Sequence, residues 1–226
     1  KLYNFLAQPN NIAHLDLSGT DCNIESVFGA LLHGCTNNLV HLNLSRNQFS
    51  GKKSNHKDLI VPVSIKKFFS TAIFLRTLNL SHNRLPIEAL KAVLLGLACN
   101  ESAADLRINL SSNEFKSNGA AVLELCLADI RCVSGLDLSD NGLDMDLIQV
   151  IGAIAKNKSI KYLSIGRNFN NIKAKHLPKV LDSFVALLQD PDCSIESLSL
   201  IDSKLRNETP IILNALGSNQ SLINEI

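Results

Sequence analysis

Histidine and aspartate recur at matching places along the chain, and they are the first residues whose types could do chemistry. His14 and His41 lie 27 residues apart, and Asp16 comes two residues after His14. Asp137 occupies the position that matches Asp16 in a later, similar stretch of sequence. A zinc site needs three or four such ligands, but the next matching residue after His41 is Thr77. The sequence has no G-x-S-x-G, no H-E-x-x-H and no glycine-rich phosphate loop. We therefore expect no enzymatic activity, no metal site and no cofactor.

Asparagine recurs more regularly than histidine, at the end of a fixed apolar pattern. In "LVHLNLSRNQF", Leu39, Leu42 and Leu44 are followed by Asn47, and the pattern returns in "LRTLNLSHNRL" and "VSGLDLSDNGL". A buried amide without partners costs about 1–3 kcal/mol, so each asparagine must find hydrogen bonds. Two donors and an acceptor on a short stem allow it to bridge successive turns. We expect a structural ladder of Asn47, Asn83, Asn113, Asn141 and Asn168, with Thr20 and Ser203 supplying less at the two remaining positions.

The elements that must position these side chains come from a repeat. The third apolar residue of the pattern falls at seven places, with spacings of 27, 36, 30, 28, 27 and 35 residues: Leu17, Leu44, Leu80, Leu110, Leu138, Ile165 and Leu200. This is the leucine-rich repeat signature. Its alternation at Leu42 and Leu44 predicts a strand, and the stripe of Leu90, Val93, Leu94 and Leu97 predicts a helix.

One strand and one helix cannot bury their apolar faces alone, so the repeats must stack. We predict an α/β solenoid of the ribonuclease-inhibitor-like kind, with a parallel sheet on the concave side and helices on the convex side. Residues 1–226 should form one leucine-rich repeat domain fragment of about seven repeats, with the ends of the array missing.

Three irregularities interrupt the repeat. Asp105 stands where an apolar residue is expected and Leu106 comes one position late, which predicts a bulge or a slipped strand entry. The two long spacings predict insertions in loops at one rim, one around residues 51–62 and one within residues 168–198.

Composition excludes several classes of function. The chain has 226 residues, a net charge of +1 and no tryptophan, so neither its charge nor its aromatic content indicates a nucleic-acid partner. No apolar run is long enough to span a bilayer. The six cysteines show no C-x-x-C pair, and strings such as "LLGLACN" around Cys99 favour buried, reduced thiols.

The concave side should expose the strand residues that alternate with the apolar ones. Interfaces favour tyrosine and arginine as anchors, so the candidate contacts are Arg46, Arg107, Tyr162 and Arg167. Most other residues expected on this face are small and polar, including the serines that follow the strands: Ser18, Ser45, Ser81, Ser111 and Ser139. A solvated face without a partner is the competing interpretation.

A basic stretch offers a different kind of contact. The insert over residues 51–67 contains Lys52, Lys53, Lys57, Lys66 and Lys67, which could attract anionic lipid head groups weakly. A flexible, solvated loop is the simpler interpretation, because glycine, serine and asparagine surround these lysines and Asp58 dilutes their charge.

Specific strings resemble one family. "LDLSGTDC", "ALLHGCTNNLVHLNLSR", "LLGLACNES", "LDLSDNGLDMDL" and "KNKSIKYLSIGRNFNN" occur in an order and spacing similar to the central leucine-rich repeat region of the CARMIL proteins, the capping protein, actin-related-protein complex and myosin-I linkers. The resemblance covers the whole chain. It implies a scaffold of a cytoplasmic actin regulator that acts at the plasma membrane and cytoskeleton and controls filament capping. It also implies a homodimer formed through segments absent here, and none of these residues carries the capping-protein motif.

Three functions therefore remain open from the sequence. The first is a non-catalytic scaffold that binds proteins of the actin-regulatory machinery. The second is a module that contacts anionic lipid through residues 51–67, and the third is a passive spacer between flanking domains.

Overall fold

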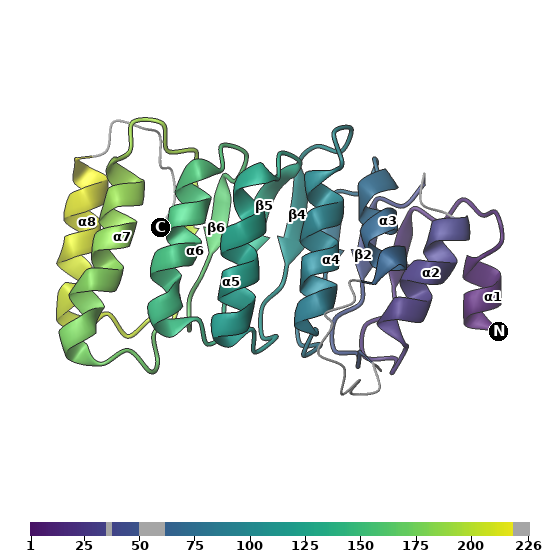
Figure 1. Ribbon diagram of the computed structural model, residues 1–226, viewed down its shortest axis with the longest axis horizontal. Coiled ribbons are helices and arrows are strands. Elements are labelled where there is room, and N and C mark those ends of the chain that lie inside the picture. The colour runs from purple at the N-terminus through teal and green to yellow at the C-terminus, as the bar shows by residue number, and fades with distance from the viewer. Residues whose placement is uncertain (35–37, 50–61, 219–226) are drawn as a thin grey trace.

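The repeats fold into one parallel sheet covered on a single side by helices (Figure 1). The computed structural model describes residues 1–34, 38–49 and 62–218. Seven strands follow one another in chain order, each hydrogen-bonded in parallel to the next: β1 (His14–Asp16), β2 (His41–Asn43), β3 (Thr77–Asn79), β4 (Leu106–Asn109), β5 (Val133–Asp137), β6 (Tyr162–Ser164) and β7 (Ser197–Ser199).

Helices alternate with the strands along the chain. The α-helices are α1 (Leu2–Leu6), α2 (Ile24–Gly34), α3 (Val63–Thr71), α4 (Ile87–Ala98), α5 (Lys116–Cys126), α6 (Leu147–Lys156), α7 (Leu177–Gln189) and α8 (Thr209–Gly217). Short 3-10 turns are η1 (Leu127–Asp129), η2 (Asp144–Asp146), η3 (Ala174–His176) and η4 (Arg206–Glu208). No helix in the described ranges has the length and apolar character needed to cross a bilayer.

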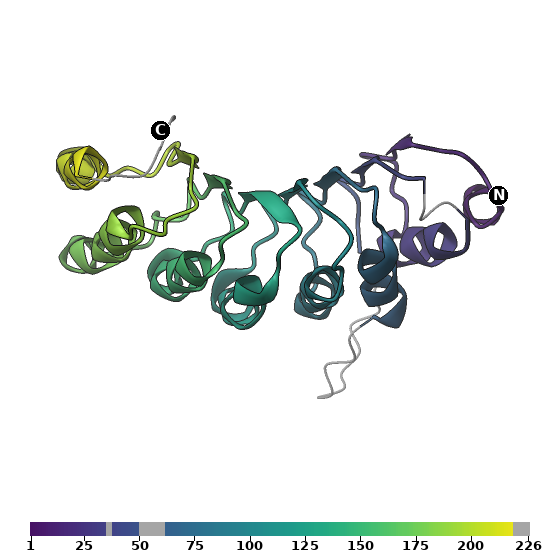
Figure 2. The same ribbon diagram turned by 90° about the horizontal axis from the view of Figure 1, so that it is seen from above.

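The stack is curved, with the sheet on its inner side (Figure 2). Strands in a sheet lie about 4.8 Å apart, whereas packed helices need about 8–10 Å, so the helical side must be the longer arc. The predicted fold class, an α/β leucine-rich repeat solenoid, is confirmed. The strand register keeps equivalent residues side by side, because His41 pairs with His14 on one side and with Thr77 on the other.

The core lies between the sheet and the helices. In β3, Leu78 is buried while Thr77 and Asn79 on either side are partly exposed, as the strand alternation requires. The predicted stripe of α4 is buried along its whole length. Near the amino-terminal end, Phe28, Phe68 and Phe69 are fully buried with ring centroids 5.1 Å apart, and this aromatic cluster joins α2 to α3.

The predicted bulge before β4 is present. Asp105 has a φ of 54°, and the pairing of β4 with β5 shifts register between Leu106 and Arg107. The exposed Asp105 is thereby turned outward while Leu106 is buried, so the irregular repeat keeps its apolar residue in the core.

The two long repeats have different outcomes. Residues 50–61, which make up most of the first insert, lie outside the described residues. The predicted loop and its lysines Lys52, Lys53 and Lys57 therefore lie outside them as well. In the second long repeat the prediction of a rim loop is wrong in part, because some of the extra chain extends a helix. Helix α7 has 13 residues, whereas α6 in the preceding repeat has 10.

Each strand leads into a left-handed turn. The residue two places after the third apolar position has a φ between 55° and 62° in every repeat: Gly19, Arg46, His82, Ser112, Asp140, Arg167 and Asp202. Such values are uncommon outside glycine, so the stack must hold these turns in place. The turn redirects the chain so that the next residue, the ladder asparagine, points into the core. It also buries Ser45 and Ser81, which corrects the expectation that they belong to the concave surface.

The cysteines differ more in exposure than the sequence suggested. The five that the structure describes are free, and Cys22, Cys126 and Cys132 are buried. Cys99 is exposed at the end of α4 and Cys193 is half-buried, so the expectation of burial is wrong for Cys99. Leu97 is the last buried residue of the α4 stripe. The helix ends at Ala98, and Cys99 directly after it is exposed.

These thiols should react at different rates. Burial raises the pKa of Cys132 to about 11, which leaves less thiolate at a given pH. With iodoacetamide at neutral pH we expect rapid labelling of Cys99, with Cys132 labelled at least about tenfold more slowly until the protein unfolds. Peptide mass spectrometry of time points measures both rates in one sample. Equal rates in the folded protein would contradict the placement of these two residues.

Candidate interaction surface

Each of the five ladder asparagines donates to a carbonyl in its own repeat and to one in the preceding repeat, and its Oδ1 accepts from at least one backbone N–H of the preceding repeat. The Nδ2 group of Asn113 donates to the carbonyl of Leu110 in its own repeat (2.9 Å) and to that of Leu80 in the preceding repeat (3.0 Å). Its Oδ1 accepts from the backbone N–H groups of Asn83 (3.2 Å) and Leu85 (3.0 Å). The side chain therefore replaces the hydrogen bonds that the backbone loses as it leaves the sheet.

The ladder changes at its two ends. Thr20 donates its hydroxyl to the carbonyl of Leu17 (2.8 Å), and its backbone N–H reaches Oδ1 of Asn47 (3.2 Å). At the other end the hydroxyls of Ser199 and Ser203 are buried without a hydrogen-bond partner among the described residues. A serine is too short to bridge to the preceding repeat, so the ladder of amides ends at Asn168.

A second pair of buried asparagines, missed in the sequence, holds the opposite rim. Asn157 donates to the carbonyls of Leu127 and Ile130 (both 2.7 Å) and accepts from the backbone N–H of Ile160 (3.0 Å). Asn100 makes equivalent bonds at the end of α3, to the carbonyls of Phe69 (2.8 Å) and Ala72 (3.3 Å). Both occur where a helix ends and the chain returns to a strand, in "LACNES" and "IAKNKS". That shared position is the signal that could have identified them.

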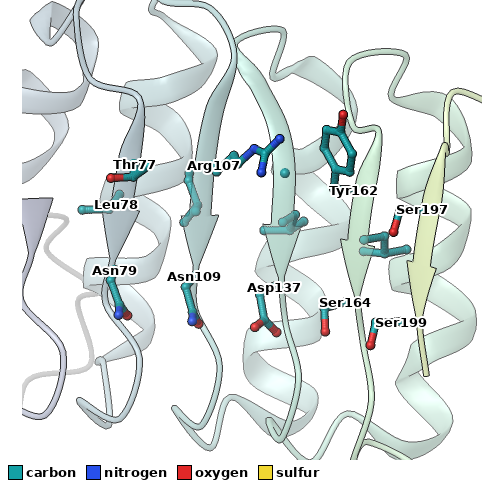
Figure 3. Close-up of a pocket in the computed structure, with 14 residues that line it drawn as sticks. Thr77, Leu78, Asn79, Arg107, Asn109, Asp137, Tyr162, Ser164, Ser197 and Ser199 are labelled. Carbon is teal, nitrogen blue, oxygen red and sulfur yellow. The ribbon is translucent and has the colours of Figure 1, made fainter. Parts of the chain in front are cut away.

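The centre of the concave face carries a pair of large side chains from different strands. The Arg107 guanidinium carbon lies 4.5 Å from the centroid of the Tyr162 ring. Strand β5 lies between them, but its residue in this register is Gly135, so Arg107 crosses an open gap to reach the ring (Figure 3). A Cβ at Gly135 would lie 3.0 Å from Cγ of Arg107. Arg107 and Tyr162 are two separate candidate contacts in the sequence, and the fold brings them together.

This pair lies in a groove of about 350 Å³ that extends across β3 to β7. A second row of side chains lines it, two residues further along each strand: Asn79, Asn109, Asp137, Ser164 and Ser199 (Figure 3). In this row the Oδ1 atoms of Asn79 and Asn109 accept from the N–H and hydroxyl of the serine two residues later. These bonds fix the two amides, and no bond from either NH₂ group to another described residue accompanies them.

Arg46 and Arg167 lie away from the central pair, in the left-handed turns at the rim. Arg167 donates from Nε (2.9 Å) and from a terminal nitrogen (2.7 Å) to one carboxylate oxygen of Asp202. Both partners are more than half exposed, so this ion pair contributes at most about 1 kcal/mol. Arg46 borders a separate rim cavity with Asp21 and His82.

His14 and His41 are stacked on the concave face. The rings of His14 and His41 are 4.4 Å apart, and Nδ1 of His41 is 2.7 Å from the hydroxyl of Thr77. Asp16 accepts from the backbone N–H of Ser18 (2.8 Å), and this bond lowers the pKa of its carboxyl. Within the described residues, no cluster of three or more histidine, cysteine, aspartate or glutamate side chains could hold a metal ion.

Two lysines of the basic insert fall within the described residues. Lys66 and Lys67 are exposed on α3, the helix that follows residues 50–61. This places them on the convex, helical side of the solenoid (Figure 2), on the opposite face from Arg107 and Tyr162.

Residues 1–225 match the family model described as the CARMIL family leucine-rich repeat domain. The chain belongs to the CARMIL family. It is 51% identical over 98% of its length to the capping protein, Arp2/3 and myosin-I linker protein 3 of Homo sapiens, and 41% identical to linker protein 2 of Mus musculus. Protein CARMIL of Dictyostelium discoideum is 28% identical over a similar span. This CARMIL domain covers 16% of the human relative's length and 21% of the Dictyostelium one.

Solved structures outside the family share the fold. The actin-binding site 2 of leiomodin-1 aligns with a TM-score of 0.56 at 13% identity, over 69% of this chain and 87% of that one. The tropomodulin C-terminal domain of Caenorhabditis elegans aligns with a TM-score of 0.54 at 12% identity, over 69% and 91%. At such low identity the likeness concerns the fold of the CARMIL repeats alone.

Proposed function

We propose that this CARMIL domain is a non-catalytic scaffold that binds a protein of the actin-regulatory machinery on its concave face. The names of its relatives point to capping protein, the Arp2/3 complex and myosin-I as the machinery concerned. The full-length protein would act in the cytoplasm, at the plasma membrane and cytoskeleton. It could be a homodimer through segments outside this chain.

The central groove is the observation that supports this proposal most. Tyr162 is 37% exposed although it is one of the largest side chains on the concave face, and Arg107 is stacked on it. Arginine and tyrosine are among the residue types that most often anchor protein interfaces. A side chain needed only for the fold would be buried in the core, as Leu163 beside Tyr162 is.

A binding experiment with purified components tests the scaffold. The immobilised domain is offered capping protein, the Arp2/3 complex and myosin-I separately, alongside an Arg107→Ala, Tyr162→Ala variant. We expect one of them to be retained by the parent and at least about tenfold less by the variant, because interface anchors typically contribute 2 kcal/mol or more. The matched control is Leu125→Ala, which removes an exposed apolar side chain from α5 on the convex side.

Retention of none of the three, or equal retention by the parent and the Arg107, Tyr162 variant, would contradict a concave-face scaffold. The domain would then be a passive spacer that sets the distance between its flanking domains.

Contact with anionic lipid is the second candidate, carried by the exposed Lys66 and Lys67 on α3 together with Lys52, Lys53 and Lys57. Basic residues near an anionic membrane contribute about 1 kcal/mol each. Sedimentation with phosphatidylserine vesicles should lose about tenfold or more in partition when all five become serine. Unchanged sedimentation would dispose of the lipid role, and Arg107→Ala, on the other face, is the control for charge.

A further inference from the structure

The Arg107 side chain is held in place by contacts that leave its hydrogen-bonding edge open. The guanidinium lies over the Tyr162 ring, with its central carbon 4.5 Å from the ring centroid, and the gap at Gly135 allows the side chain to lie across β5. A contact of this kind orients the flat group without using its N–H donors. None of the ion pairs or hydrogen bonds found among the described residues uses the Arg107 guanidinium. Its N–H donors therefore remain available to a ligand in the groove.

Of the charged residues near Arg107, Lys161 is paired and Asp137 lies in the second row. Lys161, next to Tyr162, donates to Glu196 at 2.9 Å, and this bond raises the pKa of the lysine. Asp137 lies two residues beyond Gly135 along β5, about 6.6 Å further down the strand. Arg107 is thus the cation of the groove, with uncharged Thr77 and Ser197 at the ends of its row.

The second row of the groove supplies a different kind of partner. Because the Oδ1 atoms of Asn79 and Asn109 are engaged by Ser81 and Ser111, the NH₂ groups of both amides point away from those bonds. Such groups are donors for backbone carbonyls. A ligand that offers a carboxylate to one row and peptide carbonyls to the other matches the chemistry of both rows.

We propose that the groove binds an acidic peptide segment of a partner protein, with a glutamate or aspartate carboxylate received by Arg107. A guanidinium and a carboxylate match in shape and form paired, charge-assisted hydrogen bonds. A phosphate group, from a lipid or a phosphopeptide, fits less well because it concentrates nearly two negative charges on one group, while the groove offers a single cation to balance them. This inference rests on the proposed role of the concave face in protein binding.

Nuclear magnetic resonance of the arginine side chains tests the proposal directly. The protein is labelled with ¹⁵N-arginine, and Arg107→Lys assigns the Nε–H signal of Arg107. The probes are a short, capped peptide of alternating glutamate and glycine, the same peptide with glutamine, and inorganic phosphate. We expect the Arg107 signal to shift saturably with the glutamate peptide and at least about tenfold more weakly with the other two. The glutamine peptide lacks the charged carboxylate, and inorganic phosphate offers no peptide carbonyls to Asn79 and Asn109.

Variants separate a positioned site from general attraction between charges. Tyr162→Leu keeps the charge of Arg107 but removes the aromatic ring, and we expect it to weaken binding of the glutamate peptide by about threefold or more. Arg131 is exposed between η1 and β5, outside the groove, and donates to the carbonyl of Ala128. It is the internal control, whose signal should not move. Equal shifts at Arg131, an equal response to the glutamine peptide, or a stronger response to phosphate would each overturn the proposal.

The two proposals fail in different ways. Capture of an actin-regulatory protein through Arg107 and Tyr162, with no response to the glutamate peptide, would retain the scaffold and reject the acidic ligand. A saturable glutamate response without capture of any of the three proteins would retain the acidic site and reject that choice of partner.

Discussion

Replacing Asn113 by alanine is expected to lower the free energy of unfolding by roughly 3–4 kcal/mol. The substitution removes the donors to the carbonyls of Leu80 and Leu110 and the acceptor for the backbone N–H groups of Asn83 and Leu85. All these groups lie inside the stack, where each unsatisfied one costs about 1–3 kcal/mol before the structure relaxes. Urea unfolding followed by far-ultraviolet circular dichroism measures the loss.

Asn170→Ala is the matched control for this prediction. Asn170 is exposed, and its amide makes a single 3.5 Å contact with the carbonyl of Arg167. We expect its loss to change stability by less than about 0.5 kcal/mol. Similar effects of the two substitutions would mean that the ladder bonds are replaced by water and do not hold the repeats together.

Gly96→Ala should destabilise the protein by about 2–3 kcal/mol, although alanine is the better helix former. Gly96 lies in α4 where the helix crosses close to α3. A Cβ there would come within 2.5 Å of the carbonyl oxygen of Lys66 and 2.7 Å of Cβ of Phe69. Neither atom is the end of a flexible side chain, so the two helices would have to separate and the packing of Phe69 in the aromatic cluster would loosen.

The same substitution at Gly152 should have the opposite sign. Gly152 lies on the exposed side of α6, and a Cβ there would meet no other atom within 4 Å. The helix would gain about 0.5–1 kcal/mol, because alanine loses less conformational freedom than glycine on folding. Thermal unfolding of the two variants side by side gives the comparison, and a shift of the same sign for both would contradict the close approach of α3 and α4.

Several features could be predicted because they repeat. An apolar residue every second position in a strand and every third or fourth in a helix must face the core, so the stripe of α4 and the alternation of β3 follow from the sequence. The bulge could also be predicted, because it breaks the repeat: Asp105 cannot take the buried position, while Leu106 one place later can.

Other features depend on contacts between repeats that no local pattern records. The exposure of Cys99 and the lengthening of α7 depend on where a helix ends, which packing against neighbours decides. Asn100 and Asn157 were missed because they occur once every few repeats. The rim positions of Arg46 and Arg167 depend on the left-handed turns, which the repeat pattern does not reveal.

The sequence by itself determined the leucine-rich repeat solenoid, its amide ladder and its family, because those depend on the types and spacing of residues. The tertiary structure alone decided that Arg107 meets Tyr162. These residues are 55 positions apart and belong to strands that are not paired with each other, and they meet because the sheet register places Gly135 between them. A contact of this kind depends on the missing side chain of a third residue, which becomes visible only once all three strands are in register.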